Sequence, residues 1–211
     1  MKRIKTHTTK ITNCSLLLLL IISTASAQDT SNTYRVSPEQ LALAEKNGYF
    51  AGLDLGYALI EWDTFLESND ITSGKNGGFS FAAKGGYRWN YRVALEYGLQ
   101  YLPSVDYSQD GKDYTIDEWM SYLSLEIDAP LYKKATAFVQ AGLGYHYFDD
   151  ELTGTDTTIK PYYALGLNYA VNSKWSTDFK CSFFSTDDEV DEHNGYIPTI
   201  NSFTIGAKYA F

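Results

Sequence analysis

The sequence has little that could support catalysis, redox chemistry or metal binding. Its 211 residues include only two cysteines and three histidines. Cys181 is the single cysteine beyond the first 27 residues, which excludes a disulfide framework. His146 and His193 have no serine and acid arranged around them as in a hydrolase, and no phosphate-binding, metal or cofactor motif is present. We therefore predict no enzymatic activity, no catalytic residues, no metal site and no cofactor.

Long apolar runs and positive charge are also scarce. Beyond residue 27 no stretch approaches the roughly 20 apolar residues of a membrane-spanning helix, and mean hydropathy is −0.29. Those first 27 residues hold four of the 17 basic residues and none of the 26 acidic ones, so the rest of the chain carries a net charge of −13. Such an acidic chain is not expected to bind nucleic acid.

The first residues have the three parts of a secretory signal peptide. Four basic residues lie between positions 2 and 10, residues 16–22 are an unbroken apolar run, and Ala25-Ser26-Ala27 is a small-residue cleavage site. We predict a signal peptide over residues 1–27, cleaved after Ala27. The alternative, a membrane anchor, needs a much longer apolar run.

Residues 28–48 precede the repetitive part of the chain. A polar start is followed by Ser37-Pro38-Glu39-Gln40, a capping box with proline at the first helical position, and Gly48 marks a stop. This segment predicts a short helix in the periplasm that acts as a spacer.

From residue 49 onward, an alternation with a period of two recurs eight times. One row of each segment is apolar, often aromatic, and the other row is small or polar, which is typical of a strand with different solvents on its two faces. If the apolar row faces lipid, the other row faces a polar interior. Mean hydropathy then stays low, because half of the residues of every strand are polar or small. The segments are residues 49–59, 79–89, 93–101, 119–129, 137–147, 163–171, 175–183 and 201–211.

The connections alternate between short and long. Short turns fall at residues 90–91, 132–134 and 172–174, and polar segments lie at 63–76, 103–115, 149–158 and 186–196. This pattern matches the short periplasmic turns and longer outer loops of bacterial outer membrane barrels. We predict an all-β fold over residues 49–211, an eight-stranded antiparallel up-and-down transmembrane β-barrel whose last strand pairs with the first. A soluble barrel with its apolar row turned inward is the alternative.

Charged residues occur in the row that would face the narrow interior. Because eight strands leave just enough space for side chains, these charges must pair with one another. We predict an ion-pair network that fills the barrel, with a narrow ion path as the alternative. Its members are Asp54, Lys84, Arg88, Glu96, Glu126, Asp178, Lys180 and Lys208.

The predicted loops are acidic. Residues 187–193 form the densest run, and Asp149-Asp150-Glu151, Asp106, Asp110 and Asp113 add to the same rim. Carboxylates at this density could bind Ca²⁺ or Mg²⁺ or meet a cationic partner. Because no segment has the spacing of an EF-hand loop, we favour solvated loops.

The chain resembles the small outer membrane β-barrel family, which includes the OmpA transmembrane domain and OmpX. The resemblance rests on the signal peptide, the eight amphipathic strands, residues 162–172 with the following Lys174-Trp175, and the terminal Tyr209-Ala210-Phe211. The resemblance implies a location in the outer membrane of a Gram-negative bacterium and contact with its lipids and lipopolysaccharide. It also implies insertion by the outer membrane assembly machinery, which would read Phe203, Ile205, Tyr209 and Phe211 as an assembly signal. Since the sequence ends with this strand, we expect no peptidoglycan-binding domain after it.

The sequence as a whole predicts a monomeric, non-enzymatic barrel that displays acidic loops and acts in envelope integrity or surface interaction. A narrow porin is the first alternative. The second is a lipid-modifying enzyme with His193 on the outer rim.

Overall fold

The fold is described by a computed structural model of the chain. It describes residues 47–61, 72–73, 77–109, 111–132, 134–151, 154–184 and 199–211. Ten strands cover most of them, and none of these residues belongs to a helix that could cross a membrane. The predicted signal peptide, the predicted periplasmic helix and the acidic run at 187–193 lie outside the described residues.

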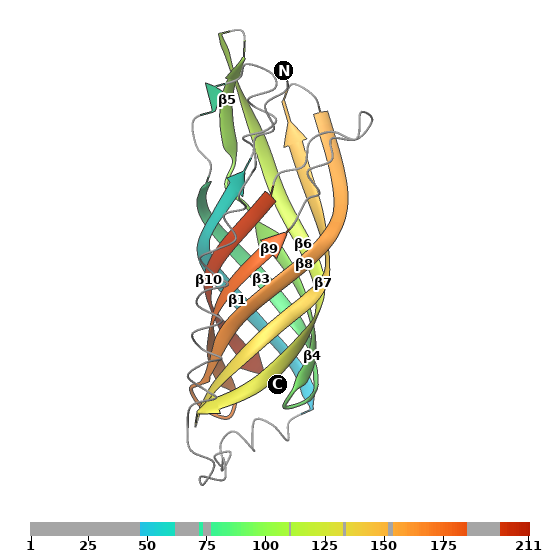
Figure 1. Cartoon of the computed structure of the whole chain (residues 1–211), viewed down its shortest axis with the longest axis vertical. Coiled ribbons are helices and arrows are strands. Elements are labelled where there is room, and N and C mark those ends of the chain that lie inside the picture. Colours follow the sequence, from blue (N-terminus) through green and yellow to red (C-terminus); the bar gives the residue numbers. More distant parts are fainter. Residues whose placement is uncertain are drawn as a thin grey trace, which may run out of the picture. The chain divides into compact units, whose positions relative to one another are not determined.

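Eight of the ten strands form a closed antiparallel barrel (Figure 1). Each of these eight strands pairs with the barrel strand that follows it in the chain, including β6 with β7. The first strand, β1, also pairs with the last, β10, from Phe50↔Ala210 to Glu61↔Thr199, and this pairing closes the barrel. The predicted fold and the pairing of the first and last strands are therefore confirmed. The barrel strands are β1 (Gly48–Glu61), β3 (Gly77–Asn90), β4 (Val93–Tyr101), β6 (Lys112–Tyr132), β7 (Ala135–Asp150), β8 (Gly154–Ala170), β9 (Trp175–Phe184) and β10 (Thr199–Ala210).

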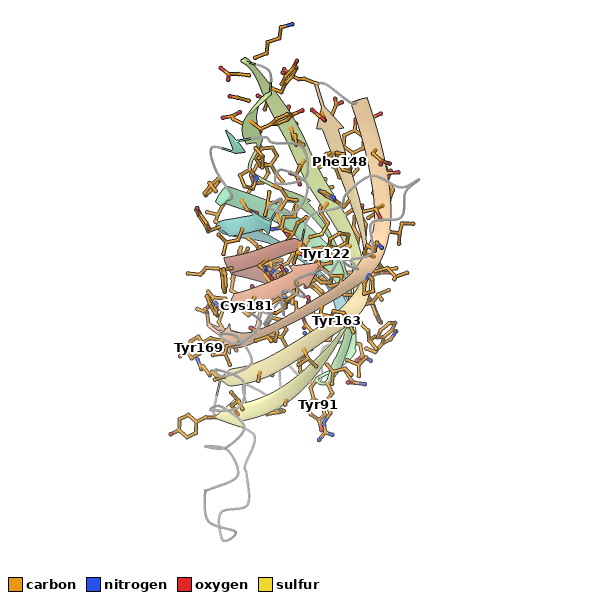
Figure 2. All side chains as sticks on the ribbon, turned by 45° about the horizontal axis from the view of Figure 1, so that its top comes forward. Tyr91, Tyr122, Phe148, Tyr163, Tyr169 and Cys181 are labelled. Carbon is orange, nitrogen blue, oxygen red and sulfur yellow. The ribbon has the colours of Figure 1, made fainter. Side chains whose placement is uncertain are left out.

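The register places even-numbered residues inside the barrel and odd-numbered residues outside. On β1, Asp54 is 1% exposed, whereas its apolar neighbours Leu53 and Leu55 are 67% and 58% exposed. Tyr163 and Tyr169 on β8 are likewise exposed, while Tyr122 is buried (Figure 2). Because the apolar row of the alternation faces outward, the alternative of a soluble barrel with this row turned inward is wrong.

The short turns lie at one end of the barrel, which we call the turn end; the opposite end is the loop end. Asn90 Oδ1 accepts the backbone N–H groups of Arg92 and Val93 at 2.8 and 3.0 Å. Asn172 Oδ1 accepts those of Lys174 and Trp175, both at 2.9 Å. A side-chain oxygen therefore replaces a backbone acceptor in each turn, which is why asparagine begins both.

Strands at the loop end are longer than predicted. The segment at 103–115 is a hairpin of β5 (Val105–Gln109) with the start of β6, which gives β6 21 residues, and β8 begins at Gly154. The remaining strand, β2 (Thr72–Ser73), pairs with β5. The sequence predicted loops here because these segments contain many acidic residues. In the structure the acidic residues alternate with Val105, Tyr107 and Ile116, which are buried.

Gly111 in the β5–β6 turn adopts a φ of 75°, a conformation that residues with a side chain rarely adopt. A Cβ built there meets no atom within 4 Å, so only backbone strain opposes a substitution. We expect Gly111→Ala to lower the free energy of unfolding by about 1 kcal/mol, measured by urea titration of the protein in lipid vesicles. An unchanged midpoint would contradict the assigned turn.

Candidate functional site in the barrel interior

The barrel interior holds a chain of ion pairs, and its first link is centred on Lys84 of β3. Lys84 Nζ lies 2.9 and 2.8 Å from the two carboxylate oxygens of Asp178 on β9 and also forms an ion pair with Asp54 on β1. Gly206 of β10 lies between these acids, and a Cβ there would collide with both carboxylates. The inward glycine therefore makes room for two acids to share one ammonium group.

Lys208 of β10 forms the second link. Its Nζ lies 3.0 Å from Glu96 Oε2, 3.0 Å from Glu126 Oε2 and 3.8 Å from Asp178 Oδ2. The same nitrogen lies 5.3 and 5.4 Å from the ring centroids of Phe50 and Phe138, within the range of cation–π attraction. Lys208 thus connects three acids from three strands while two aromatic rings cover it.

Arg88 of β3 continues the chain toward the turn end. Its guanidinium donates to Glu126 Oε1 at 2.6 Å and to Asp128 on the same strand as Glu126. Asp128 is absent from the predicted network, although it occupies the next inward position after Glu126. The alternation alone could have identified it.

Tyr122 of β6 closes the chain on the other side. Its hydroxyl donates to Glu96 Oε1 at 3.0 Å and accepts from Lys180 Nζ at 2.8 Å. Lys180 also lies 3.2 Å from Asp54 Oδ2. The Tyr122 ring stacks on Tyr162 with centroids 4.3 Å apart and planes 8° from parallel. Gly98 faces this ring, and a Cβ there would overlap it at the Tyr122 Cζ atom.

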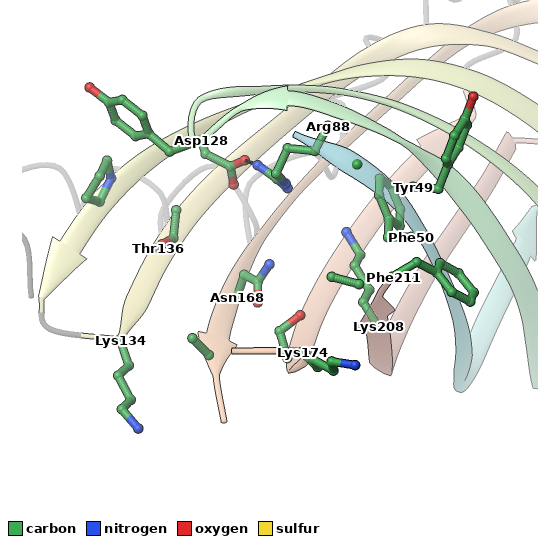
Figure 3. Close-up of a pocket in the computed structure, with 16 residues that line it drawn as sticks. Tyr49, Phe50, Arg88, Asp128, Lys134, Thr136, Asn168, Lys174, Lys208 and Phe211 are labelled. Atoms are coloured by element: carbon green, nitrogen blue, oxygen red, sulfur yellow. Dashed lines mark hydrogen bonds and ion pairs between the residues drawn. The ribbon is translucent and has the colours of Figure 1, made fainter. Parts of the chain in front are cut away.

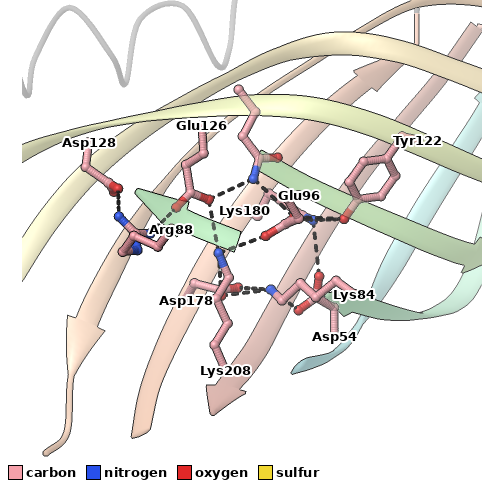
Figure 4. Close-up of polar contacts among 11 residues, drawn as sticks. Asp54, Lys84, Arg88, Glu96, Tyr122, Glu126, Asp128, Asp178, Lys180 and Lys208 are labelled. Carbon is pink, nitrogen blue, oxygen red and sulfur yellow. Dashed lines mark hydrogen bonds and ion pairs between the residues drawn. The ribbon is translucent and has the colours of Figure 1, made fainter. Parts of the chain in front are cut away.

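All eight charged residues named from the sequence meet in this cluster, together with Asp128 (Figure 4). Among the described residues the cluster combines four cations with five carboxylates, and Gln140 donates to both Glu96 and Glu126. Removing one member would leave a buried charge without compensation, which costs several kcal/mol.

The loop-end half of the interior is mainly apolar and encloses a few buried polar groups, whereas the sequence predicted a polar interior throughout. Tyr122 and Tyr162 belong to one buried apolar cluster. The cluster continues from Tyr122 to Phe148 near the end of β7 (Figure 2). The difference arises because most inward positions near the loop end carry large apolar residues, whereas many of those near the centre carry charges. Further members are Ile60, Leu102, Val105, Tyr107, Ile116, Met120, Phe184 and Ile200.

His146 lies inside this half of the barrel. Its Nε2 is 2.9 Å from Glu118 Oε2, both side chains are fully buried, and its ring lies 5.8 Å from that of Phe184. This surrounding suits a structural polar pair within an apolar cluster. His193, the candidate for the enzymatic alternative, lies outside the described residues.

Three acidic residues at the loop end each accept a hydrogen bond from the hydroxyl group of a nearby residue. Asp113 accepts from Ser108 Oγ at 2.5 Å, Asp106 from Thr115 Oγ1 at 3.1 Å, and Asp150 from the Tyr107 hydroxyl at 2.8 Å. Burial and this last hydrogen bond raise the pKa of the Tyr107 phenol, so it remains a donor. Within the described ranges, no group of three potential ligands is placed to hold a metal ion.

The predicted assembly-signal residues lie on the outer face of β10 or directly after it. Ile205 and Phe211 are 67% and 72% exposed. Tyr209 makes edge-on ring contacts with Trp175 at 5.0 Å and with Phe211 at 5.3 Å. These rings form an aromatic group on the turn-end rim, a position that aromatic residues favour at a membrane boundary.

Comparison with known proteins gives one family and a set of similar structures. Residues 14–211 match the model of the family described as "Outer membrane protein beta-barrel domain". Neisserial surface protein A is 16% identical with a TM-score of 0.53, and the alignment covers 78% of this chain and 97% of that protein. OprG from Pseudomonas aeruginosa is 13% identical with a TM-score of 0.52 and coverage of 80% and 98%.

The N-terminal barrel domain of OprF from Pseudomonas aeruginosa is 10% identical with a TM-score of 0.51, covering 78% of this chain and 98% of that domain. At these identities the similarity concerns the fold. No sequence among the curated proteins matches this chain.

Proposed function

Because the chain belongs to the outer membrane protein β-barrel family, we propose that it is a closed, non-enzymatic barrel that holds an acidic sheet at the cell surface. The observation that carries this proposal is that side chains fill the interior from its centre to the loop end. Ion pairs occupy the central part, the Tyr122–Tyr162 stack adjoins them, and the apolar cluster follows. The function of such a barrel depends on the surface that it exposes outside the cell and not on transport through its interior.

The proposed orientation places the turn end in the periplasm and the loop end outside the cell. Short turns of outer membrane barrels face the periplasm, and an export signal over residues 1–27 would deliver the chain to that side. Exposed aromatic residues flank the barrel wall near both ends, including Tyr49 and Trp175 at the turn end and Phe79 and Trp119 toward the loop end. The lipids and lipopolysaccharide of the outer membrane would contact the apolar row between them.

The loop-end strands supply the surface for interaction. The extensions of β5, β6, β7 and β8 continue the barrel sheet beyond the aromatic residues and expose Asp106, Asp117, Asp149 and Asp156. A cationic surface or protein is the complementary partner.

Surface interaction and envelope integrity can be separated by one variant. Replacing residues 104–117 by a short turn removes the β5–β6 hairpin and leaves the central network in place. We expect adhesion to a cationic surface to fall while sensitivity of the cells to detergent stays unchanged. Normal adhesion would contradict the display role, and increased sensitivity would instead favour a role in envelope integrity.

Deletion of Phe211 tests the assembly signal that the family resemblance implies. The deletion removes an exposed ring and its contact with Tyr209, so refolded protein should keep its barrel. We expect surface levels in cells to drop by roughly tenfold, since a partner outside this chain would no longer recognise the end of β10. Quantitative surface labelling measures this effect, and normal surface levels would contradict it.

A further inference from the structure

Each of the three short turns at the turn end has a basic residue as its last residue. Arg92, Lys134 and Lys174 directly precede β4, β7 and β9, and we call them the rim cations. The backbone carbonyl group of each accepts a hydrogen bond from the neighbouring strand beyond its hairpin. The same backbone contact therefore holds the three residues at equivalent positions around the rim. The donors are the N–H groups of Asp128, Ala170 and Ala210, at 2.8, 2.9 and 2.8 Å.

The two lysines of this set lie at the rim and not in the barrel interior (Figure 3). Lys134 Nζ donates to Val171 O and Lys174 Nζ to the Tyr209 hydroxyl, both at 3.2 Å. Because these acceptors are uncharged, neither hydrogen bond neutralises the ammonium group. Arg88 inside the barrel differs, since two buried carboxylates already compensate its guanidinium group. The positive charge of the turn end that can act on a partner is therefore on its outer rim.

Exposed aromatic rings lie beside the rim cations. The Arg92 guanidinium lies 4.9 Å from the centroid of the Tyr91 ring, within the range of cation–π attraction. Lys174 Nζ lies 5.6 Å from the centroid of the Tyr209 ring. Tyrosine and tryptophan collect where a membrane meets water, so charges beside these rings lie at the level of the lipid headgroups. Further exposed rings at this end belong to Trp89, Tyr132, Tyr169 and Trp175.

Exposed negative charge is scarce at the turn end. In the part of this end that the structure describes, no acidic side chain is exposed, because Glu126 and Asp128 are buried in the ion-pair chain. The carboxyl group of Phe211 lies beside Gly48 of β1, where the rim has no short turn. The turn end is therefore mainly positive, whereas the loop end is mainly negative. The described exposed acids of the loop end are Asp106, Asp113, Asp117, Asp149, Glu151 and Asp156.

We propose that the rim cations bind the phosphate groups of anionic phospholipids in the leaflet that surrounds the turn end. A lipid fits better than a soluble anion, because the charges lie beside rings that favour the membrane boundary. Basic residues at such a boundary attract anionic headgroups, and a guanidinium group matches the geometry of phosphate oxygens. This surface goes beyond the proposed display function, and the proposed orientation decides only which leaflet it contacts.

The test uses the refolded mature chain in vesicles of phosphatidylcholine. The probes are phosphatidylglycerol and phosphatidylcholine with the same spin label on one acyl chain, and electron paramagnetic resonance measures how much of each is immobilised against the barrel. We expect phosphatidylglycerol to associate about threefold more strongly at low salt. Adding about 0.5 M NaCl should reduce this preference, because salt screens the charges. Equal association of the two lipids at low salt would overturn the proposal.

Variants assign the preference to the rim cations. The combination of Arg92→Gln, Lys134→Gln and Lys174→Gln should make the association of the two lipids about equal, and Lys174→Gln alone should lower the preference part of the way. Lys112→Gln, which removes an exposed lysine at the loop end, should leave it unchanged. Migration as a compact species in unheated gels shows that each variant is folded. A preference that survives the triple substitution would contradict the site.

Two further results would assign the rim to another occupant and overturn the proposal. The first is equal association of the two lipids together with binding to purified cell-wall peptidoglycan that the triple substitution abolishes. The second is a lipid preference that appears only after residues 28–46 are deleted, because the preceding segment of the chain would then occupy the rim. Since the vesicles offer the same lipids on both sides, a negative result leaves the proposed orientation and display function untouched.

Discussion

Lys208→Met should lower the free energy of unfolding by about 3–5 kcal/mol, because it leaves buried carboxylates without their shared cation. Lys208 Nζ contacts Glu96 and Glu126 at 3.0 Å and Asp178 at 3.8 Å. Methionine has a similar length, so packing against Phe50 and Phe138 is largely kept. Urea titration of the refolded protein in lipid vesicles measures the loss.

The matched control is Lys112→Met, which removes an exposed lysine at the loop end and should change stability by less than about 0.5 kcal/mol. Adding Glu126→Gln to Lys208→Met should recover part of the loss, since one uncompensated carboxylate is neutralised. A loss below about 1 kcal/mol for Lys208→Met would mean that the buried carboxylates find other compensation.

Tyr122→Ala should lower the free energy of unfolding by about 3–5 kcal/mol, as for other large-to-small substitutions in packed interiors. Tyr122 contributes a stacked ring 4.3 Å from Tyr162 and a hydroxyl that connects Glu96 with Lys180. Removing the ring also opens a cavity at the boundary between the charged and apolar halves. Thermal and urea unfolding in vesicles measure the loss.

Tyr122→Phe separates the two contributions of this side chain. It keeps the stacked ring and removes two hydrogen bonds to charged groups, so we expect a smaller loss of about 1.5–3 kcal/mol. If Tyr122→Phe and Tyr122→Ala were equally destabilising, the ring would contribute nothing and the stack would not be part of the packed interior.

The sequence predicted the barrel well because lipid and a narrow interior impose opposite demands on alternate residues. Asp54 between Leu53 and Leu55, and Lys208 between Ala207 and Tyr209, show that alternation directly. The three short turns then fixed the order of strands. The same logic named eight members of the central cluster, because each charged residue occupies an inward position.

Three features of the structure could not be predicted from the alternation and the short turns. The β5–β6 hairpin was hidden by Asp106 and Asp113, whose charges resemble those of a loop although Tyr107 between them is buried. The apolar loop-end half depends on which inward residues of distant strands reach the same level, which alternation within one strand does not give. The stack of Tyr122 on Tyr162 joins two strands separated by β7 and depends on the curvature of the closed sheet.

Single-channel recording in planar lipid bilayers tests the central claim most directly, since a filled interior leaves no continuous water path. Refolded protein with its natural sequence should give no sustained current across a wide range of voltages. Steady, ohmic current steps from the natural sequence would contradict the closed barrel and favour a narrow porin.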